Sequence, residues 1–215
     1  MEIPNPEWIA CWLPFLLSPL ELEDFLANKK LYPSSLPLTS EGFYLNAAFL
    51  RSQLRKTEAP QGQLILTDKF LSVVPNPGVG LLLAIDALQP QQTLQIFAEK
   101  KDKIQEKLGT VLSLTEVNKR KKSLGKVEFV LGEKQKVEIK PEEIIQILVD
   151  KDTQIELDFR LGGAKVLGKT KTRVSASGGK VGIVIDSRGR PIEFDKEEDK
   201  GEKIERWMRV FAEIR

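Results

Sequence analysis

Apolar residues in the first half of the chain recur at the spacings of short helices and strands. Helical spacing runs from Phe43 to Leu54, and Thr39 or Ser40 is placed to cap a helix over 41–56. Further helices are predicted over 21–30, 80–88 and 98–108, and strands over 63–67 and 93–97. This succession of helices and strands predicts an α/β layer.

The second half of the chain alternates apolar and charged residues over short stretches, which is typical of β-strands. A hairpin is predicted from 126–131 and 136–140, with further strands over 153–160, 170–176, 181–186 and 192–194. Apolar residues from Ile204 to Ile214 have helical spacing and predict a closing helix. We therefore expect a small, mostly antiparallel β-barrel or sandwich, with the C-terminal helix over its open edge or end.

Proline and glycine usage divides the chain further. Ten of the 12 prolines lie in residues 1–90, and the glycines concentrate after residue 160. Residues 117–126 carry five positive charges and no acid, as expected of a linker. The predicted organisation is a lead-in over 1–36, an α/β region over 37–116, a basic linker over 117–126 and a β-rich region over 127–215.

Composition excludes several classes of chemistry. The 215 residues include no histidine and one cysteine, Cys11. An intrachain disulfide, a His/Cys zinc cluster and Ser-His-Asp or Cys-His catalysis are therefore excluded within this chain. The net charge of +2 argues against bulk nucleic-acid affinity but permits local basic patches.

The apolar tract from Trp8 to Leu20 is the strongest one near the start of the chain. It is too short to cross a bilayer and is interrupted by Pro14 and Pro19. We expect it to be buried core rather than a membrane anchor, with no transmembrane segment, and we take the cytoplasm as the default compartment.

One basic segment, residues 160–192, holds eight positive residues and a single acid, Asp186. It is interpreted either as an anion or nucleic-acid surface, or as a solvated face neutralised by the acidic stretch 193–205. Within it, Gly178 and Gly179 can supply the positive φ of a tight hairpin. The candidate partner- or anion-binding residues are Arg173, Gly178, Gly179, Lys180, Asp186, Arg188, Gly189 and Arg190.

The two arginines of this set that follow Asp186 are the sharpest candidates. Arg188 and Arg190 point to the same side if the backbone is extended, and together they can clamp a carboxylate or phosphate of a partner. Gly189 can take a left-handed conformation between them. We expect both arginines to be exposed at the tip of a turn.

Four segments in series carry a family resemblance. They are Trp12–Phe15 leading into Phe25–Pro33, Pro75–Gly78 leading into Leu81–Pro90, Leu108-Gly109, and Gly178–Pro191 followed by Trp207. In order and approximate spacing they resemble the C-terminal half of the glutamate mutase accessory protein family.

That family is similar to the actin-like ATPases, with an added C-terminal β-rich region. The resemblance implies that the α/β layer is a partial actin-like, RNase H-like remnant. Actin-like ATPases hold phosphates on an early hairpin that has no counterpart before Trp12, and Leu66–Phe70 stands where their paired glycines are expected. The resemblance therefore implies an incomplete nucleotide site, no cofactor and no enzymatic activity.

Three functions remain open from the sequence. The leading interpretation is a non-enzymatic accessory or scaffold protein that binds another protein. The second is a nucleic-acid or anion-binding module that uses the basic surface over 160–190. The third is the C-terminal half of a split actin-like ATPase, whose partner is a chain that supplies the missing N-terminal half.

Overall fold

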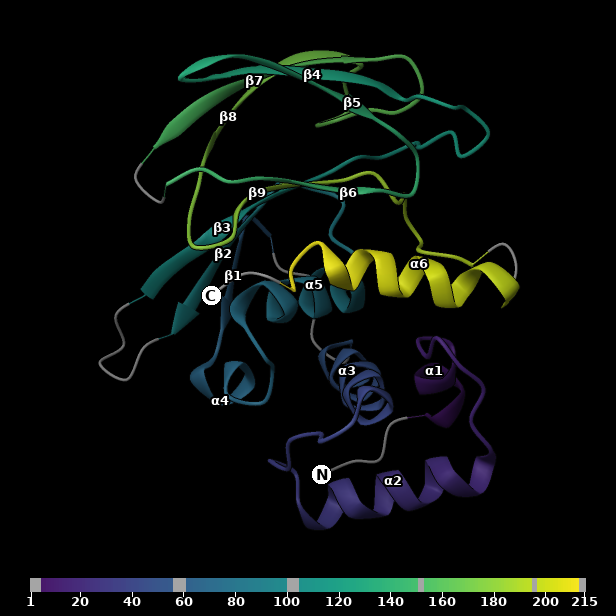
Figure 1. Ribbon diagram of the computed structural model, residues 1–215. Helices are drawn as coiled ribbons and strands as arrows, with labels where there is room; N and C mark the ends of the chain where they lie inside the picture. Colours follow the sequence, from purple (N-terminus) through teal and green to yellow (C-terminus); the bar gives the residue numbers. More distant parts are fainter. Residues whose placement is uncertain (1–4, 56–60, 100–104, 151–152, 195–196, 213–215) are drawn as a thin grey trace.

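The computed structural model describes residues 5–55, 61–99, 105–150, 153–194 and 197–212, and shows a mixed α/β fold with two sheets (Figure 1). The helices of this described part are α1 (Pro6–Ala10), α2 (Pro19–Leu31), α3 (Ser40–Leu54), α4 (Asp68–Leu71), α5 (Pro77–Leu88) and α6 (Glu197–Arg209). The strands are β1 (Gln63–Leu66), β2 (Leu94–Glu99), β3 (Gln105–Ser113), β4 (Gly125–Leu131), β5 (Glu133–Ile139), β6 (Ile144–Ile147), β7 (Gln154–Leu161), β8 (Lys171–Ser177) and β9 (Gly182–Asp186).

The larger sheet has five strands in the order β1-β2-β3-β9-β6. β1 and β2 are parallel, as are β3 and β9, and the other two pairs are antiparallel. Strands from both predicted regions therefore share this sheet, and the division at 117–126 is not a boundary between sheets. β9 is an interior strand between β3 and β6, and all of its residues are buried because both faces of the sheet are covered there.

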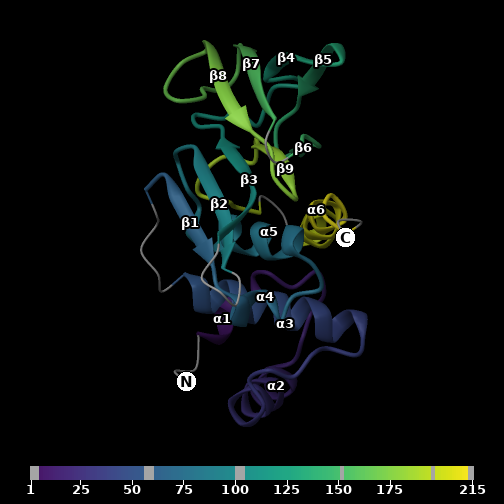
Figure 2. The same cartoon turned by 90° about the vertical axis from the view of Figure 1, so that its left-hand side faces the viewer.

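Helices cover one face of the five-stranded sheet (Figures 1 and 2). Every residue of α5 from Gly78 to Leu88 is buried, as its leucine-rich sequence requires. Ile204, Trp207 and Met208 of α6 enter the same core. The C-terminal helix predicted from sequence is thus confirmed, but it lies in the helical layer rather than over the end of a barrel.

The second sheet, in the order β5-β4-β7-β8, packs on the opposite face of the first (Figure 1). Its inward side chains, including Val127, Leu157 and Phe159, form a second core with Leu112 and Ile185 of the five-stranded sheet. Among the described residues the strands form two stacked open sheets and no closed barrel. Of the two architectures predicted for the β-rich half, the stacked one is found.

Helices and strands predicted from local residue spacing are confirmed where the spacing belongs to a single element or hairpin. Thr39 caps α3, and β4 and β5 form the predicted hairpin. The helix predicted over 98–108 is wrong, because β3 occupies 105–113 and pairs with both β2 and β9. No strand forms over 192–194. For β3, pairing with distant strands overrides local propensity, and residues 100–104 of the predicted helix lie outside the described ranges. In 192–194, the backbone N–H of Ile192 donates to the side-chain oxygen of Gln89 at 2.9 Å instead of to a strand.

The expected linker over 117–126 and the apolar tract from Trp8 to Leu20 both contact the rest of the protein. The backbone N–H of Asn118, in the expected linker, donates to the carbonyl of Gly163 at 2.8 Å, and β4 already begins at Gly125. In the apolar tract near the start, Trp12 and Leu13 are buried as predicted, whereas Leu16 is 94% exposed. No helix in the described ranges has the length and apolar character needed to span a membrane.

Candidate binding site

The structure separates the predicted site residues into three places. Asp186, Arg188 and Arg190 are buried between the five-stranded sheet and the helices. Gly178, Gly179 and Lys180 lie in the connection between β8 and β9, and Arg173 stands on the outer face of β8. The basic segment 160–192 is therefore not one continuous surface.

Arg188 is the centre of a buried ion-pair network. Its Nη1 lies 2.6 Å from Oδ1 of Asp86, and its Nε and Nη2 lie 2.9 and 2.8 Å from the two carboxylate oxygens of Asp186. Arg190 Nη2 reaches Asp186 Oδ2 at 2.5 Å, and Arg51 Nε reaches Asp86 Oδ2 at 2.8 Å. We call this set the arginine cluster; its members are Arg51, Asp86, Asp186, Arg188 and Arg190.

Two tryptophans complete the surroundings of the cluster. The guanidinium carbon of Arg188 lies 4.7 Å from the ring centre of Trp207, and that of Arg51 lies 4.5 Å from the ring centre of Trp12. These stacked faces are favourable for a desolvated cation. The cluster thus ties the segment after α1, the helices α3, α5 and α6, and the end of β9 to one another.

Electrostatics keeps Asp186 and Arg188 ionised. Burial raises the pKa of Asp186, but the attraction of Arg188 and then of Arg190 outweighs it, so the net pKa lies below the usual value. For Arg188, burial lowers the pKa, and the attraction of Asp186 and Asp86 more than compensates and raises it. The carboxylate and the guanidinium both stay charged at neutral pH.

The expectation of two exposed arginines on a turn tip is wrong. The side chains of Arg188 and Arg190 are 1% and 4% exposed, so neither can clamp a partner from the surface. The physical reason is Asp86, an acid in an otherwise apolar buried helix, which requires cations at close range. Its partner lies 102 residues away along the chain, beyond the reach of local pattern.

Gly178 and Gly179 allow neighbouring backbone atoms to pack where a side chain would otherwise lie. A Cβ on Gly178 would lie 2.0 Å from the carbonyl oxygen of Val149, and one on Gly179 would lie 2.5 Å from the carbonyl carbon of Leu108. Positive φ occurs instead at Gly182 and, as expected, at Gly189. Gly178 and Gly179 therefore belong to the packing of the sheets, and only Lys180 of this group is exposed.

The outer face of the four-stranded sheet is the exposed polar surface with the most defined charge pattern. Alternate residues of β4, β5, β7 and β8 point away from the core, since their neighbours Val127, Phe129, Leu157 and Phe159 are buried. We call this surface the outer face. Its charged side chains are Lys126, Glu128, Lys134, Lys136, Glu138, Glu156, Asp158, Arg160, Lys171 and Arg173.

Strand register places like charges opposite one another on the outer face. Lys126 pairs in register with Arg160, which in turn pairs with Lys171, so three cations cross three neighbouring strands. In the adjacent row, Glu128 lies opposite Asp158. Like charges directly opposite on neighbouring strands destabilise a sheet. Opposite charges on the flanking strands offset part of this cost, because Glu138 lies opposite Lys126, and Arg173 lies opposite Asp158.

Ion pairs along and between the strands offset part of the repulsion. Glu128 lies 2.7 Å from Lys126 and 3.0 Å from Lys134, and Arg160 lies 3.2 Å from Asp158. Hydrogen bonds from Lys126 and then Lys134 lower the pKa of Glu128 to about 2. Within the described residues, Lys136, Lys171, Arg173, Glu138 and Glu156 have no ion-pair partner.

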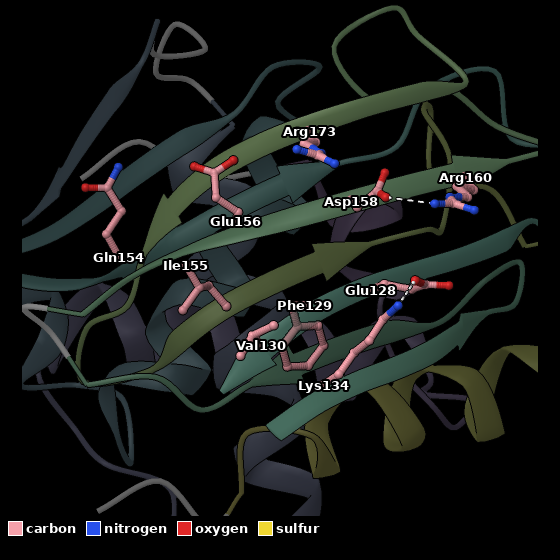
Figure 3. Close-up of a pocket in the computed structure, with 10 residues that line it drawn as sticks. All are labelled: Glu128, Phe129, Val130, Lys134, Gln154, Ile155, Glu156, Asp158, Arg160 and Arg173. Atoms are coloured by element: carbon pink, nitrogen blue, oxygen red, sulfur yellow. Dashed lines mark hydrogen bonds and ion pairs between the residues drawn. The ribbon is translucent and has the colours of Figure 1, made fainter. Parts of the chain in front are cut away.

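Two hollows lie in the outer face and share Arg160. The first, of about 490 Å³, is lined by Glu128, Lys134, Asp158 and Arg173 among others (Figure 3). The second, of about 570 Å³, is lined by Ser123, Gly125, Lys126, Lys136, Glu138 and Arg160. In Figure 3 the side chains of Glu156, Arg173 and Asp158 stand side by side from the two neighbouring strands β7 and β8.

This arrangement can bind charged groups but holds no evident catalytic pair. Hydrogen bonds from Lys126 and Lys134 lower the pKa of Glu128 and favour its ionised form rather than proton transfer, and Asp158 is paired with Arg160. In the part of the chain that the structure describes, no three acidic or cysteine residues are placed to hold a metal ion. Sequence reasoning identified Arg173 here but missed its neighbours, because register between distant strands is not visible in local pattern.

Comparison with known proteins adds no assignment to this geometry. No protein family, no curated protein and no solved structure matches the chain.

Proposed function

We propose that this chain is a non-enzymatic accessory protein that binds an acidic segment of another protein on the outer face of its four-stranded sheet. The observation that carries the proposal is the row of three cations, Lys126, Arg160 and Lys171, across neighbouring strands. Carboxylates of a partner would relieve the repulsion within this row, and arginine binds carboxylates in a two-pronged geometry.

The balance of charge on the outer face supports an anionic partner. The face has six basic and four acidic side chains, hence a net charge of +2. Lys171 and Arg173 are exposed and lack ion-pair partners among the described residues, so an incoming carboxylate does not have to displace an existing pair. The acids Glu202 and Glu205 of α6 do not neutralise this face, because α6 lies in the helical layer on the other side (Figure 1).

A protein partner fits the outer face better than a nucleic acid does. Single strands are bound on sheets by stacked aromatic side chains, whereas Phe129 and Phe159 of this sheet point into the core. A mixed row of charges instead resembles the rim of a protein interface.

The arginine cluster supports the non-enzymatic part of the proposal. Open α/β sheets place ligands at the carboxyl ends of parallel strands, which for β3 and β9 are Ser113 and Asp186. Here the guanidinium groups of Arg188 and Arg190 already occupy the carboxylate of Asp186. A nucleotide would have to displace a buried ion-pair network to bind there.

The proposal is tested with defined charged probes. Fluorescence anisotropy of labelled hexaglutamate, hexalysine and a DNA duplex is measured against the full chain over a series of NaCl concentrations. We expect salt-sensitive binding of hexaglutamate and none of hexalysine. Binding is expected to disappear in the double variant Lys171→Glu/Arg173→Glu.

A matched control separates the outer face from net charge. Lys69→Glu/Lys180→Glu makes the same change in charge at exposed positions outside this face and should retain binding. Proteins captured from native lysate by the wild type and the control, but not by the outer-face variant, are then purified and titrated. Equal hexaglutamate binding by both variants would refute the proposal, and tighter binding of DNA would favour the nucleic-acid function.

A further inference from the structure

Exposed apolar side chains concentrate around α2, at the opposite end of the molecule from the outer face (Figure 1). Six of the ten large hydrophobic residues that are exposed in the described ranges lie between residues 16 and 38. Single exposed hydrophobic residues are normal, but a local concentration indicates an interaction surface. The exposed residues of this segment are Leu16, Leu20, Leu31, Tyr32, Leu36 and Leu38.

The two faces of α2 differ in what they contact. Leu22, Leu26 and Lys29 are buried against the rest of the protein, and the ring of Phe25 meets that of Phe49 at 6.1 Å. The outward side carries Leu20, Asp24, Ala27 and Leu31, spaced by four, three and four residues. This is the spacing of a seam between two packed helices, and Leu20 and Leu31 at its ends are 67% and 70% exposed.

We propose that the outward seam of α2 is a self-association surface, which binds the same seam of a second copy of the chain in antiparallel orientation. In this register Leu20 lies opposite Leu31 of the second copy, and Asp24 lies opposite the small Ala27. By the two-fold symmetry, each contact occurs twice, as required of an isologous interface.

Charge complementarity supports a second copy as the occupant. The same register brings Glu23 beside Lys30 of the second copy, again twice, because both residues flank the seam on the same side and an antiparallel pair brings same-side flanks together. Both side chains are exposed, and within the described residues neither has an ion-pair partner.

Helix polarity favours the same arrangement. The acidic residues Glu21, Glu23 and Asp24 lie in the first half of α2 and Lys30 lies in the last turn. An antiparallel pair therefore brings the acidic half of each helix beside the basic end of the other, and the two helix dipoles oppose each other favourably. A parallel pair would instead bring the acidic halves together.

The test is the oligomeric state of the full chain by sedimentation velocity across micromolar concentrations. We expect a concentration-dependent dimer, and Leu31→Asp should raise its dissociation constant at least about tenfold. Leu148→Asp is the matched control, because Leu148 is 67% exposed and lies outside α2. A wild type that stays monomeric, or equal effects of the two variants, would overturn the proposal.

A charge exchange tests the register directly. Glu23→Lys and Lys30→Glu should each weaken the dimer when alone, because each places like charges beside each other. An equimolar mixture of the two variants should restore it, since both contacts then pair a lysine with a glutamate. Restoration also shows that each variant is folded, and failure to restore with both variants folded by circular dichroism contradicts the antiparallel register.

Discussion

The arginine cluster and the outer face both pair arginine with aspartate, but the pairs of the cluster are buried and those of the outer face are exposed to water. In the cluster, Arg188 and Asp86 are 2.6 Å apart and their side chains are 1% and 0% exposed. On the outer face, Arg160 and Asp158 are 3.2 Å apart, with side chains 54% and 29% exposed. Loss of either member of the buried pair would leave the other charge unpaired away from water. Water screens the exposed pair and leaves it available to a partner.

The number of groups that an arginine contacts also differs between the arginine cluster and the outer face. Arg188 contacts two aspartates and a tryptophan ring, so its directional N–H groups are used inside the protein. Arg173 on the outer face makes no ion pair within the described residues, although Asp158 lies opposite it in register. An arginine that follows a strand in a turn can therefore be deeply buried, while one within a regular strand stays exposed.

The largest effect is expected from removing the central guanidinium of the cluster. Arg188→Ala leaves Asp86 and Asp186 short of a buried cation and should cost on the order of 3–5 kcal/mol of unfolding free energy. Urea unfolding followed by circular dichroism measures this cost. A cost below about 1 kcal/mol would contradict the role of the cluster.

A second effect is expected on the pH dependence of stability. The pKa of Asp186 is lowered in the folded protein, so its stabilising contribution is present above the ordinary pKa of about 3.9 and is lost as pH falls through the folded value. Unfolding free energy should therefore decline below about pH 4. In Asp186→Asn this part of the decline should disappear, whereas in Asp158→Asn on the outer face it should remain.

The fold was predictable from sequence where local spacing decides it. Thr39 and the apolar period after it predicted α3, and the alternating residues before and after Gly132 predicted the β4–β5 hairpin. The position of β9 between β3 and β6 was not predictable, because it depends on pairs such as Gly109 with Gly182 and Ile144 with Asp186, which lie far apart in the chain and leave no local pattern.

For the candidate site, the sequence contains one signal that indicates the buried cluster. Asp86 is the single acid among the apolar residues of α5, and a buried carboxylate requires compensating cations. That signal predicts a buried arginine somewhere in the chain, although not which one. The outer face depends on the register of four strands, so its rows of like charge emerged only from the structure.

A third prediction concerns the ionisation of the outer face. Lys126→Met should raise the pKa of Glu128 from about 2 toward its ordinary value of 4.5, because Lys126 is the main cause of the shift, and Lys134→Met should raise it less. Carbon-detected NMR titration of the Glu128 carboxyl measures both. An unchanged pKa in both variants would mean that the ion pairs on this face are not formed in solution.

The smallest effect is expected from Arg173→Ala, which should change the unfolding free energy by no more than about 0.5 kcal/mol. Its side chain is exposed and has no ion-pair partner among the described residues, so truncation leaves no buried charge behind. Urea unfolding beside Arg188→Ala under identical conditions makes the comparison direct. Similar losses in the two variants would show that the outer face is part of the stabilising framework, and the distinction between an enclosed structural cluster and an open binding face would fail.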